Sequence, residues 1–167
     1  NILLSYLRLQ HTATDFRFES FEVADIIRTV IKKYANQFIL KDLSVTVTGS
    51  YQVTSDKKWL SVAIEQLINN AVKYTKKGSV TIILDQNILI SDTGIGILTE
   101  DIPRIFEHGF TGFNGRKMQK STGLGLYLTK DILNQLNFDI KITSQIDQGT
   151  EVKISQVNKN RSEEHTS

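Results

Sequence analysis

The chain has 167 residues, a formal net charge of +2, 40% hydrophobic residues and no cysteine. This length suits one domain with a core of its own, and the hydrophobic fraction argues against a disordered chain. The near balance of charge gives no electrostatic footprint for nucleic acid, and the lack of cysteine excludes disulfides and thiolate metal sites. No apolar run approaches the roughly 20 residues that cross a bilayer, and the first residues do not have the pattern of a signal peptide.

The apolar spacing predicts the secondary structure in chain order. We expect a strand at 16–23, a helix at 24–40, strands at 43–47 and 51–55, a helix from an N-cap at Asp56 to about 75, a hairpin of strands 79–84 and 88–91, a short helix at 100–106, a mobile glycine-rich loop at 107–122, a helix at 124–136 and strands at 139–145 and 150–157. This order predicts an α+β two-layer sandwich, with one mixed β-sheet and helices on one face.

Three parts are expected along the chain. Residues 1–15 start with a short apolar helical pattern, which is too short to stand alone and predicts the remnant of a longer helix with a linker. Residues 16–157 form the predicted domain, and the polar residues 158–167 are predicted to be a disordered tail. Because the chain starts on Asn1, we expect it to be an excised fragment.

A first candidate motif lies on the helix predicted after Asp56. Gln66, Asn70 and Lys73 are spaced i, i+4 and i+7, so they share a stripe that differs from the apolar one. An ordinary solvent-exposed face is the plainer interpretation. Asparagine is a costly choice inside a helix, however, and a carboxamide oxygen suits magnesium, while a lysine one turn away suits a phosphate.

A second candidate motif is the loop that follows the strand at 88–91. Asp92 leaves a strand end, where its carboxylate can accept a hydrogen bond from an amino group of a ligand. Gly94 and Gly96 follow and let the backbone approach a flat ring closely. The plainer interpretation is a tight turn, because two glycines alone are weak evidence.

A third candidate motif opens the helix at 124–136. The sequence Ser-Thr-Gly-Leu-Gly-Leu at 121–126 offers free amides and a helix dipole, which suit phosphates. It fits neither the P-loop pattern nor the dinucleotide fingerprint. The preceding loop carries Arg116, Lys117 and Lys120, so it is either a lid over a polyphosphate or an ordinary surface loop.

Four segments together resemble the N, G1, F and G2 boxes of sensor histidine kinases, in the same order and spacing. They are EQLINNAVKYT at 65–75, SDTGIGI at 91–97, RIFEHGF at 104–110 and STGLGLYL at 121–128. The resemblance covers about residues 16–157. The sequence around residue 110 is most similar to that of kinases that sense antimicrobial peptides and bacitracin in Gram-positive bacteria. It implies the Bergerat ATP-binding fold, which gyrase and mismatch-repair ATPases share.

The resemblance also implies a role for each matching residue. Asn70 would ligate magnesium, Lys73 would contact phosphate, Tyr74 would pack on adenine, and Asp92 would accept from the adenine amino group, with room for the base at the two glycines that follow. Which of Arg116, Lys117 and Lys120 supplies the cation of the lid is left open. The expected catalytic residues are Gln66, Asn70 and Lys73, with Asn70 as the metal ligand. The expected ATP-binding residues are Asn70, Lys73, Tyr74, Asp92, Gly94, Gly96, Ile97, Phe106, Lys117, Lys120, Thr122, Gly123, Leu124, Gly125 and Leu126.

Two departures from the family pattern matter. Gln66 stands where many relatives carry Asn and the related ATPases carry a Glu base; since Gln cannot take a proton, we expect no fast ATP hydrolysis. None of His11, His108 and His165 has the acidic neighbour and following proline of a phosphoacceptor, because the one proline is Pro103. The acceptor histidine is therefore expected on a dimerisation domain absent from this fragment.

The favoured hypothesis is thus a kinase module with ATP and Mg²⁺ as cofactors. Its expected partners are the dimerisation domain and a response regulator, with no nucleic acid; the full-length protein is expected to be a homodimer anchored in a bacterial membrane, with this domain in the cytoplasm. One alternative is a nucleotide-sensing or interaction module that has lost the chemistry, which the intact Asn70 and Asp92 argue against. The other is a different Bergerat ATPase or a serine kinase, which Gln66 and the RIFE segment disfavour.

Overall fold

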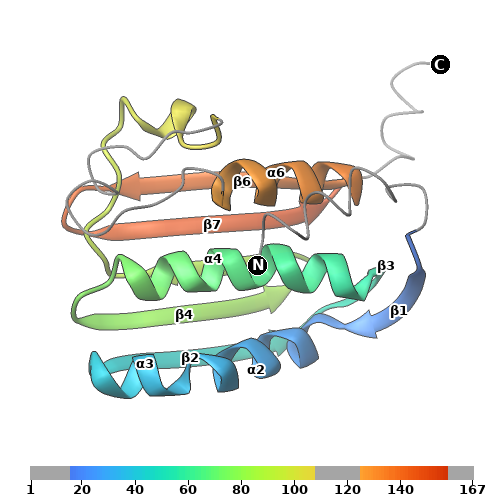
Figure 1. Ribbon diagram of the computed structural model, residues 1–167, viewed down its shortest axis with the longest axis horizontal. Helices are drawn as coiled ribbons and strands as arrows, with labels where there is room; N and C mark the ends of the chain where they lie inside the picture. The colour runs from blue at the N-terminus through green and yellow to red at the C-terminus, as the bar shows by residue number, and fades with distance from the viewer. Residues whose placement is uncertain (1–15, 108–124, 158–167) are drawn as a thin grey trace.

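The computed structural model describes residues 16–107 and 125–157 (Figure 1). The expectations for residues 1–15, for most of the loop at 107–122 and for the tail at 158–167 lie outside the described residues. Within the described part, no helix is long and apolar enough to span a bilayer.

Strands and helices follow one another largely as the apolar spacing predicts. In chain order they are β1 (Phe18–Glu22), α2 (Val23–Lys33), α3 (Ala35–Leu40), β2 (Leu43–Ser50), β3 (Gln52–Asp56), α4 (Lys57–Lys73), β4 (Gly78–Asp85), β5 (Ile88–Asp92), the 3-10 turn η2 (Ile102–Arg104), α6 (Gly125–Gln135), β6 (Phe138–Gln145) and β7 (Gly149–Gln156).

Five strands form one mixed sheet in the order β2-β4-β5-β7-β6. Only β2 and β4 run parallel, and the other pairs are antiparallel. Figure 1 shows α2, α3, α4 and α6 together in front of this sheet. The predicted α+β sandwich, with a mixed sheet and helices on one face, is therefore confirmed.

The prediction of a single sheet was wrong in one detail. β1 and β3 pair with each other as a separate two-stranded ribbon, in which Phe18 lies opposite Asp56. Phe21 is the only buried residue of β1, whereas Phe18 remains half exposed. A strand with so little buried surface cannot replace a strand of the main sheet, whose inward residues are buried in series.

The core lies between α4 and the covered face of the sheet. α4 buries a continuous stripe, and the strands bury alternate residues such as Val80, Ile82 and Leu84 of β4. The period of two fixes the strand register, because a slip of one residue would expose every one of these side chains. The predicted N-cap is confirmed, since Asp56 Oδ1 accepts from the Trp59 amide over 2.9 Å.

The helix predicted at 24–40 is broken into α2 and α3 at Tyr34. The apolar spacing continues across the break, so periodicity alone does not reveal it. Tyr34 turns its hydroxyl to Glu65 Oε1 of α4, 3.2 Å away, and Lys33 forms an ion pair with the same oxygen. These long-range contacts favour ending α2 at this point. The short helix expected at 100–106 is only the 3-10 turn η2.

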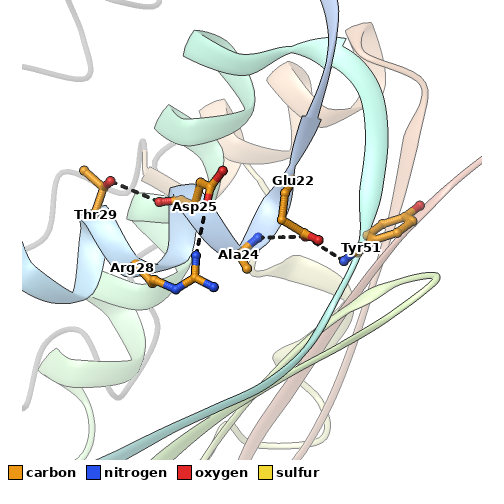
Figure 2. Close-up of polar contacts among 6 residues, drawn as sticks. All are labelled: Glu22, Ala24, Asp25, Arg28, Thr29 and Tyr51. Atoms are coloured by element: carbon orange, nitrogen blue, oxygen red, sulfur yellow. Dashed lines mark hydrogen bonds and ion pairs between the residues drawn. The ribbon is translucent and has the colours of Figure 1, made fainter.

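Glu22 joins the start of α2 to the turn between β2 and β3 (Figure 2). Its Oε2 accepts from the Tyr51 amide over 2.7 Å and from the Ala24 amide over 3.1 Å. Val23 in turn donates its amide to the Tyr51 carbonyl over 2.9 Å. The hydrogen bond from Tyr51, more than that from Ala24, lowers the pKa of Glu22 although partial burial opposes the shift.

The two edge strands of the described sheet differ in charge. β6 exposes Asp139 and Lys141, whereas β2 exposes Ser44, Thr46 and Thr48 and has no charged residue along its length. Charged side chains on an edge strand discourage pairing with another chain. Only one edge of this sheet therefore has that protection.

Candidate functional site

The last turn of α4 and its C-cap carry three of the predicted site residues. Asn70, Lys73 and Tyr74 are all partly exposed, at the end of a helix whose opposite stripe is buried. The ammonium of Lys73 lies 5.4 Å from the centroid of the Tyr74 ring. Burial raises the pKa of Tyr74, so this ring keeps its proton and presents a neutral aromatic face.

Asp92 ends β5, and main-chain amides hold its carboxylate in place. Oδ1 accepts from Gly94 over 2.9 Å and from Thr150 of β7 over 3.2 Å. Burial raises the pKa of Asp92, while these two hydrogen bonds act in the opposite direction. The carboxylate is thus largely removed from water and fixed in orientation by the protein itself, as recognition of a single donor group requires.

The loop after Asp92 is attached directly to the end of α4. Ile95 donates its amide to the Tyr74 carbonyl over 3.0 Å. A Cβ at Gly94 would lie 2.4 Å from the same carbonyl oxygen and 2.9 Å from Asp92 Oδ1. Gly94 is therefore needed so that Asp92 and α4 can approach each other. This is a different reason from the room for a base that the sequence suggested.

Gly96 is in a similar position on the other side of the loop. It has a φ of +77°, and a Cβ there would lie 2.2 Å from the Gln145 carbonyl oxygen of β6. The next residue, Ile97, donates its amide to Ser144 Oγ over 2.8 Å, and that hydroxyl lies 2.8 Å from Thr150 Oγ1. The loop is therefore held between α4 and the end of the β6–β7 hairpin.

Sequence reasoning missed the contribution of this hairpin. Ser144 and Thr150 fix the loop and Asp92, and Gly149, with a φ of +121°, lets the two segments meet, since a Cβ there would lie 1.9 Å from the Asp92 carbonyl oxygen. The strands predicted at 139–145 and 150–157 leave a turn at 147–149 between them. Nothing in the local pattern connects it with a residue more than 50 positions earlier.

The start of α6 reaches the polar stripe of α4. A Cβ at Gly125 would lie 3.5 Å from Gln66 Oε1, which is an ordinary contact distance. Further along α6, the ammonium of Lys130 lies 4.9 Å from the centroid of the Phe106 ring. Gly125, at the described end of the third motif, thus lies beside the helix that carries Asn70, and Phe106, which follows η2, lies beside α6.

The described residues connect most of the predicted site. Gly125 lies beside Gln66, and Gly94 and Ile95 lie beside the Tyr74 carbonyl. Gly94 also donates to Asp92, and Asn70 lies on α4 between Gln66 and Tyr74. Ile97 and Leu126 are partly buried at the margins of this set. The predicted residues Lys117, Lys120, Thr122, Gly123 and Leu124 lie outside the described residues, as does Arg116.

The end of α4 lies beside the fixed carboxylate of Asp92, and α6 starts across from it. This is the arrangement of a nucleotide-binding ATPase domain of the Bergerat type. A family model described as "Histidine kinase-, DNA gyrase B-, and HSP90-like ATPase" matches residues 55–160, more than half of the chain, and the chain belongs to this family. The predicted membership is confirmed.

Within this family the chain is similar to sensor histidine kinases of Gram-positive bacteria, as the sequence predicted. It is 37% identical over 162 residues to the sensor histidine kinase YxdK of Bacillus subtilis (strain 168), covering 92% of this chain and 50% of YxdK. It is 41% identical over 107 residues to the sensor protein kinase GraS of Staphylococcus aureus (strain MRSA252), covering 61% of this chain and 31% of GraS. The chain thus spans about half or less of the length of these relatives.

A solved structure shares the fold. Full-length ShkA, determined in complex with AMPPNP, matches with a TM-score of 0.75 at 21% sequence identity, covering 92% of this chain and 34% of ShkA. At this identity the match shows the fold alone.

Proposed function

We propose that this chain is the catalytic, ATP-binding domain of a two-component sensor histidine kinase. In this proposal it binds Mg-ATP and presents the γ-phosphate to a histidine on a dimerisation domain. The observation that carries the proposal is the pairing of Asp92 with the end of α4, through the Gly94 contact and the hydrogen bond from Ile95 to Tyr74. Family membership supports the reaction class, and this pairing supports the assignment of the site.

The adenine end of the site is assigned to Asp92 and Tyr74. Adenine carries an exocyclic amino group, which donates, and a carboxylate held in one orientation accepts from it without further ordering. The partly buried Tyr74 ring offers an apolar surface to a base next to that carboxylate. The acceptor at Asp92, the aromatic ring of Tyr74 and the partial burial of both side chains therefore fit a purine with an amino group.

The phosphate end is assigned to Asn70, Lys73 and Gly125. A carboxamide oxygen is a hard ligand that suits Mg²⁺, and the lysine ammonium neutralises phosphate charge. The amides at the start of α6, near Gly125, suit an anion. ATP would supply the phosphoryl group, and these residues would position it and balance its charge, which is most of what phosphoryl transfer needs from a protein.

Gln66 is assigned a positioning role. It lies one turn before Asn70 and beside Gly125, and it cannot accept a proton from water. The domain by itself is therefore expected to bind ATP and hydrolyse it only slowly. In the longer protein, the proposed partners are the dimerisation domain and a response regulator, in a membrane-anchored homodimer whose kinase domain faces the cytoplasm.

Titration with ATP, with and without Mg²⁺, tests the proposal directly. We expect saturable binding that is stronger with Mg²⁺, and an Asp92→Asn variant that binds at least about tenfold more weakly. Asp139→Asn, an equal change at an exposed position of β6, should bind like the unaltered domain. If the folded, unaltered domain shows no binding at millimolar ATP, the proposal is wrong.

A further inference from the structure

Every main-chain carbonyl at the end of α4 has a donor. The last carbonyls of a helix have no partner within the helix, so others must supply one. The Asn70 carbonyl accepts from the Tyr74 amide over 3.0 Å, and the Ala71 carbonyl accepts from Thr75 Oγ1 over 2.6 Å. The Tyr74 carbonyl accepts from Ile95 over 3.0 Å. These donors belong to the two residues that follow α4 or to the Asp92 loop.

The two remaining carbonyls share one donor from elsewhere in the fold. Lys41 Nζ donates to the Val72 carbonyl and lies 3.3 Å from the Lys73 carbonyl oxygen. Lys41 follows α3, more than 30 positions before α4 ends, and Figure 1 shows α3 at the same end of the molecule as the last turn of α4. A single side chain therefore completes the C-terminus of the helix that carries the proposed site.

A cation is suited to this position for two reasons. The C-terminus of a helix carries partial negative charge, which an ammonium balances. Lys41 is partly buried, which lowers its pKa, and the same partial exclusion of water strengthens the hydrogen bonds that its ammonium donates. Removing the ammonium would leave the carbonyls of Val72 and Lys73 without their donor in a partly buried setting.

We propose that Lys41 is a positioning residue for the nucleotide site, holding the last turn of α4 so that Lys73, Tyr74 and the Asp92 loop keep their relative places. This inference rests on the proposed function, because it assigns to ATP the site that Lys41 supports. Among the described residues, the hydrogen bonds of Lys41 go to main-chain carbonyls of α4 rather than to the side chains of Asn70 or Asp92. Its effect therefore passes through the backbone of residues 72–74.

Three variants test the role of Lys41. Lys41→Met keeps the aliphatic stem and removes the charge, Lys41→Arg keeps a cationic donor, and Lys32→Met makes the same neutral change at an exposed position of α2. We measure ATP affinity by calorimetry and the folded fraction by urea unfolding. ATP should bind about fivefold more weakly to folded Lys41→Met, and Lys41→Arg should recover much of that loss. Lys32→Met should match the unaltered domain.

The outcomes separate this inference from the proposed function. Equal ATP affinity in folded Lys41→Met and the unaltered domain would overturn the positioning role while leaving the function intact, even if stability falls. Failure of the unaltered domain to bind ATP would overturn the function and this inference with it. If Lys41→Met does not fold, Lys41→Gln provides a neutral donor of shorter reach. ATP should then bind to Lys41→Gln more weakly than to Lys41→Arg, and equal affinity of these two variants would overturn the positioning role.

Discussion

Thr150 donates its main-chain amide to Oδ1 of Asp92 over 3.2 Å, although 58 positions separate the two residues in the chain. The same oxygen accepts from Gly94, so β7 and the loop after β5 hold one carboxylate between them. A side chain held in this way keeps its orientation in the unliganded domain. The base selectivity of the site is therefore expected to depend on this carboxylate, and the orientation of the carboxylate on the β6–β7 hairpin.

Replacing Asp92 should change which nucleotide is preferred. Adenine presents an amino donor where guanine presents a carbonyl acceptor. Asp92→Asn exchanges an acceptor for a group that can also donate, so the preference for ATP over GTP should fall by about tenfold or more. Competition between the two nucleotides measures the ratio. An unchanged ratio would place the amino group of the base away from Asp92.

Acid should weaken ATP binding through the same residue. A protonated carboxyl group is a poorer acceptor, and burial raises the pKa of Asp92 above its ordinary value of 3.8. Binding should therefore decline as the pH falls, beginning above the range in which an exposed aspartate titrates. Affinity measured against pH in Asp92→Asn should lack this step, and the same step in both proteins would assign it to another group.

The glycines of the site should differ in their tolerance of a methyl group. Gly94→Ala places Cβ 2.4 Å from the Tyr74 carbonyl oxygen, so backbone must move and the free energy of unfolding should fall by about 2 kcal/mol or more. Among the described residues, a Cβ in Gly125→Ala meets only Gln66 Oε1, at 3.5 Å, and alanine favours a helix. Its stability should be unchanged or slightly higher. Urea unfolding compares the two, and equal losses would contradict the described packing.

Ser55 offers a route to a more stable domain. Within the described residues its Oγ is fully buried and has no hydrogen-bond partner, which costs free energy. Ser55→Ala should raise the free energy of unfolding by about 1 kcal/mol. The buried hydroxyl of Thr129 does have a partner, the Gly125 carbonyl at 2.7 Å, so Thr129→Val should lower the free energy of unfolding. A loss of stability in Ser55→Ala would show that its hydroxyl is satisfied.

Glu22 should contribute stability that is lost in acid. The hydrogen bonds from Tyr51 and Ala24 place the pKa of Glu22 in the folded domain below its ordinary value of 4.5. Its contribution is then complete above about pH 4.5 and disappears as the pH falls through the lower folded pKa. The stability difference between the unaltered domain and Glu22→Gln should shrink over this range. A constant difference would assign the effect of the substitution to packing.

The sequence predicted those features that repeat locally. Alternation and helical spacing gave the strands and α4, and Asp56 was identified as a cap because capping depends on residues three positions apart. The break at Tyr34 could not be predicted in this way, since it depends on Glu65 of another helix. Assigned site residues such as Asn70 and Asp92 came from motifs, whereas Thr150, Ser144 and Lys41 act through contacts that only the folded chain creates.

The uncharged edge of the sheet has a practical consequence for anyone concentrating this domain. β2 presents Ser44, Thr46 and Thr48 without a charge that would repel a second molecule, so two copies can align these strands side by side. At high protein concentration, association of the molecules should therefore begin at β2, seen as turbidity or slow oligomer growth, while Lys141 protects β6. A lysine in place of Thr46 would give β2 the same defence and should keep the protein dispersed.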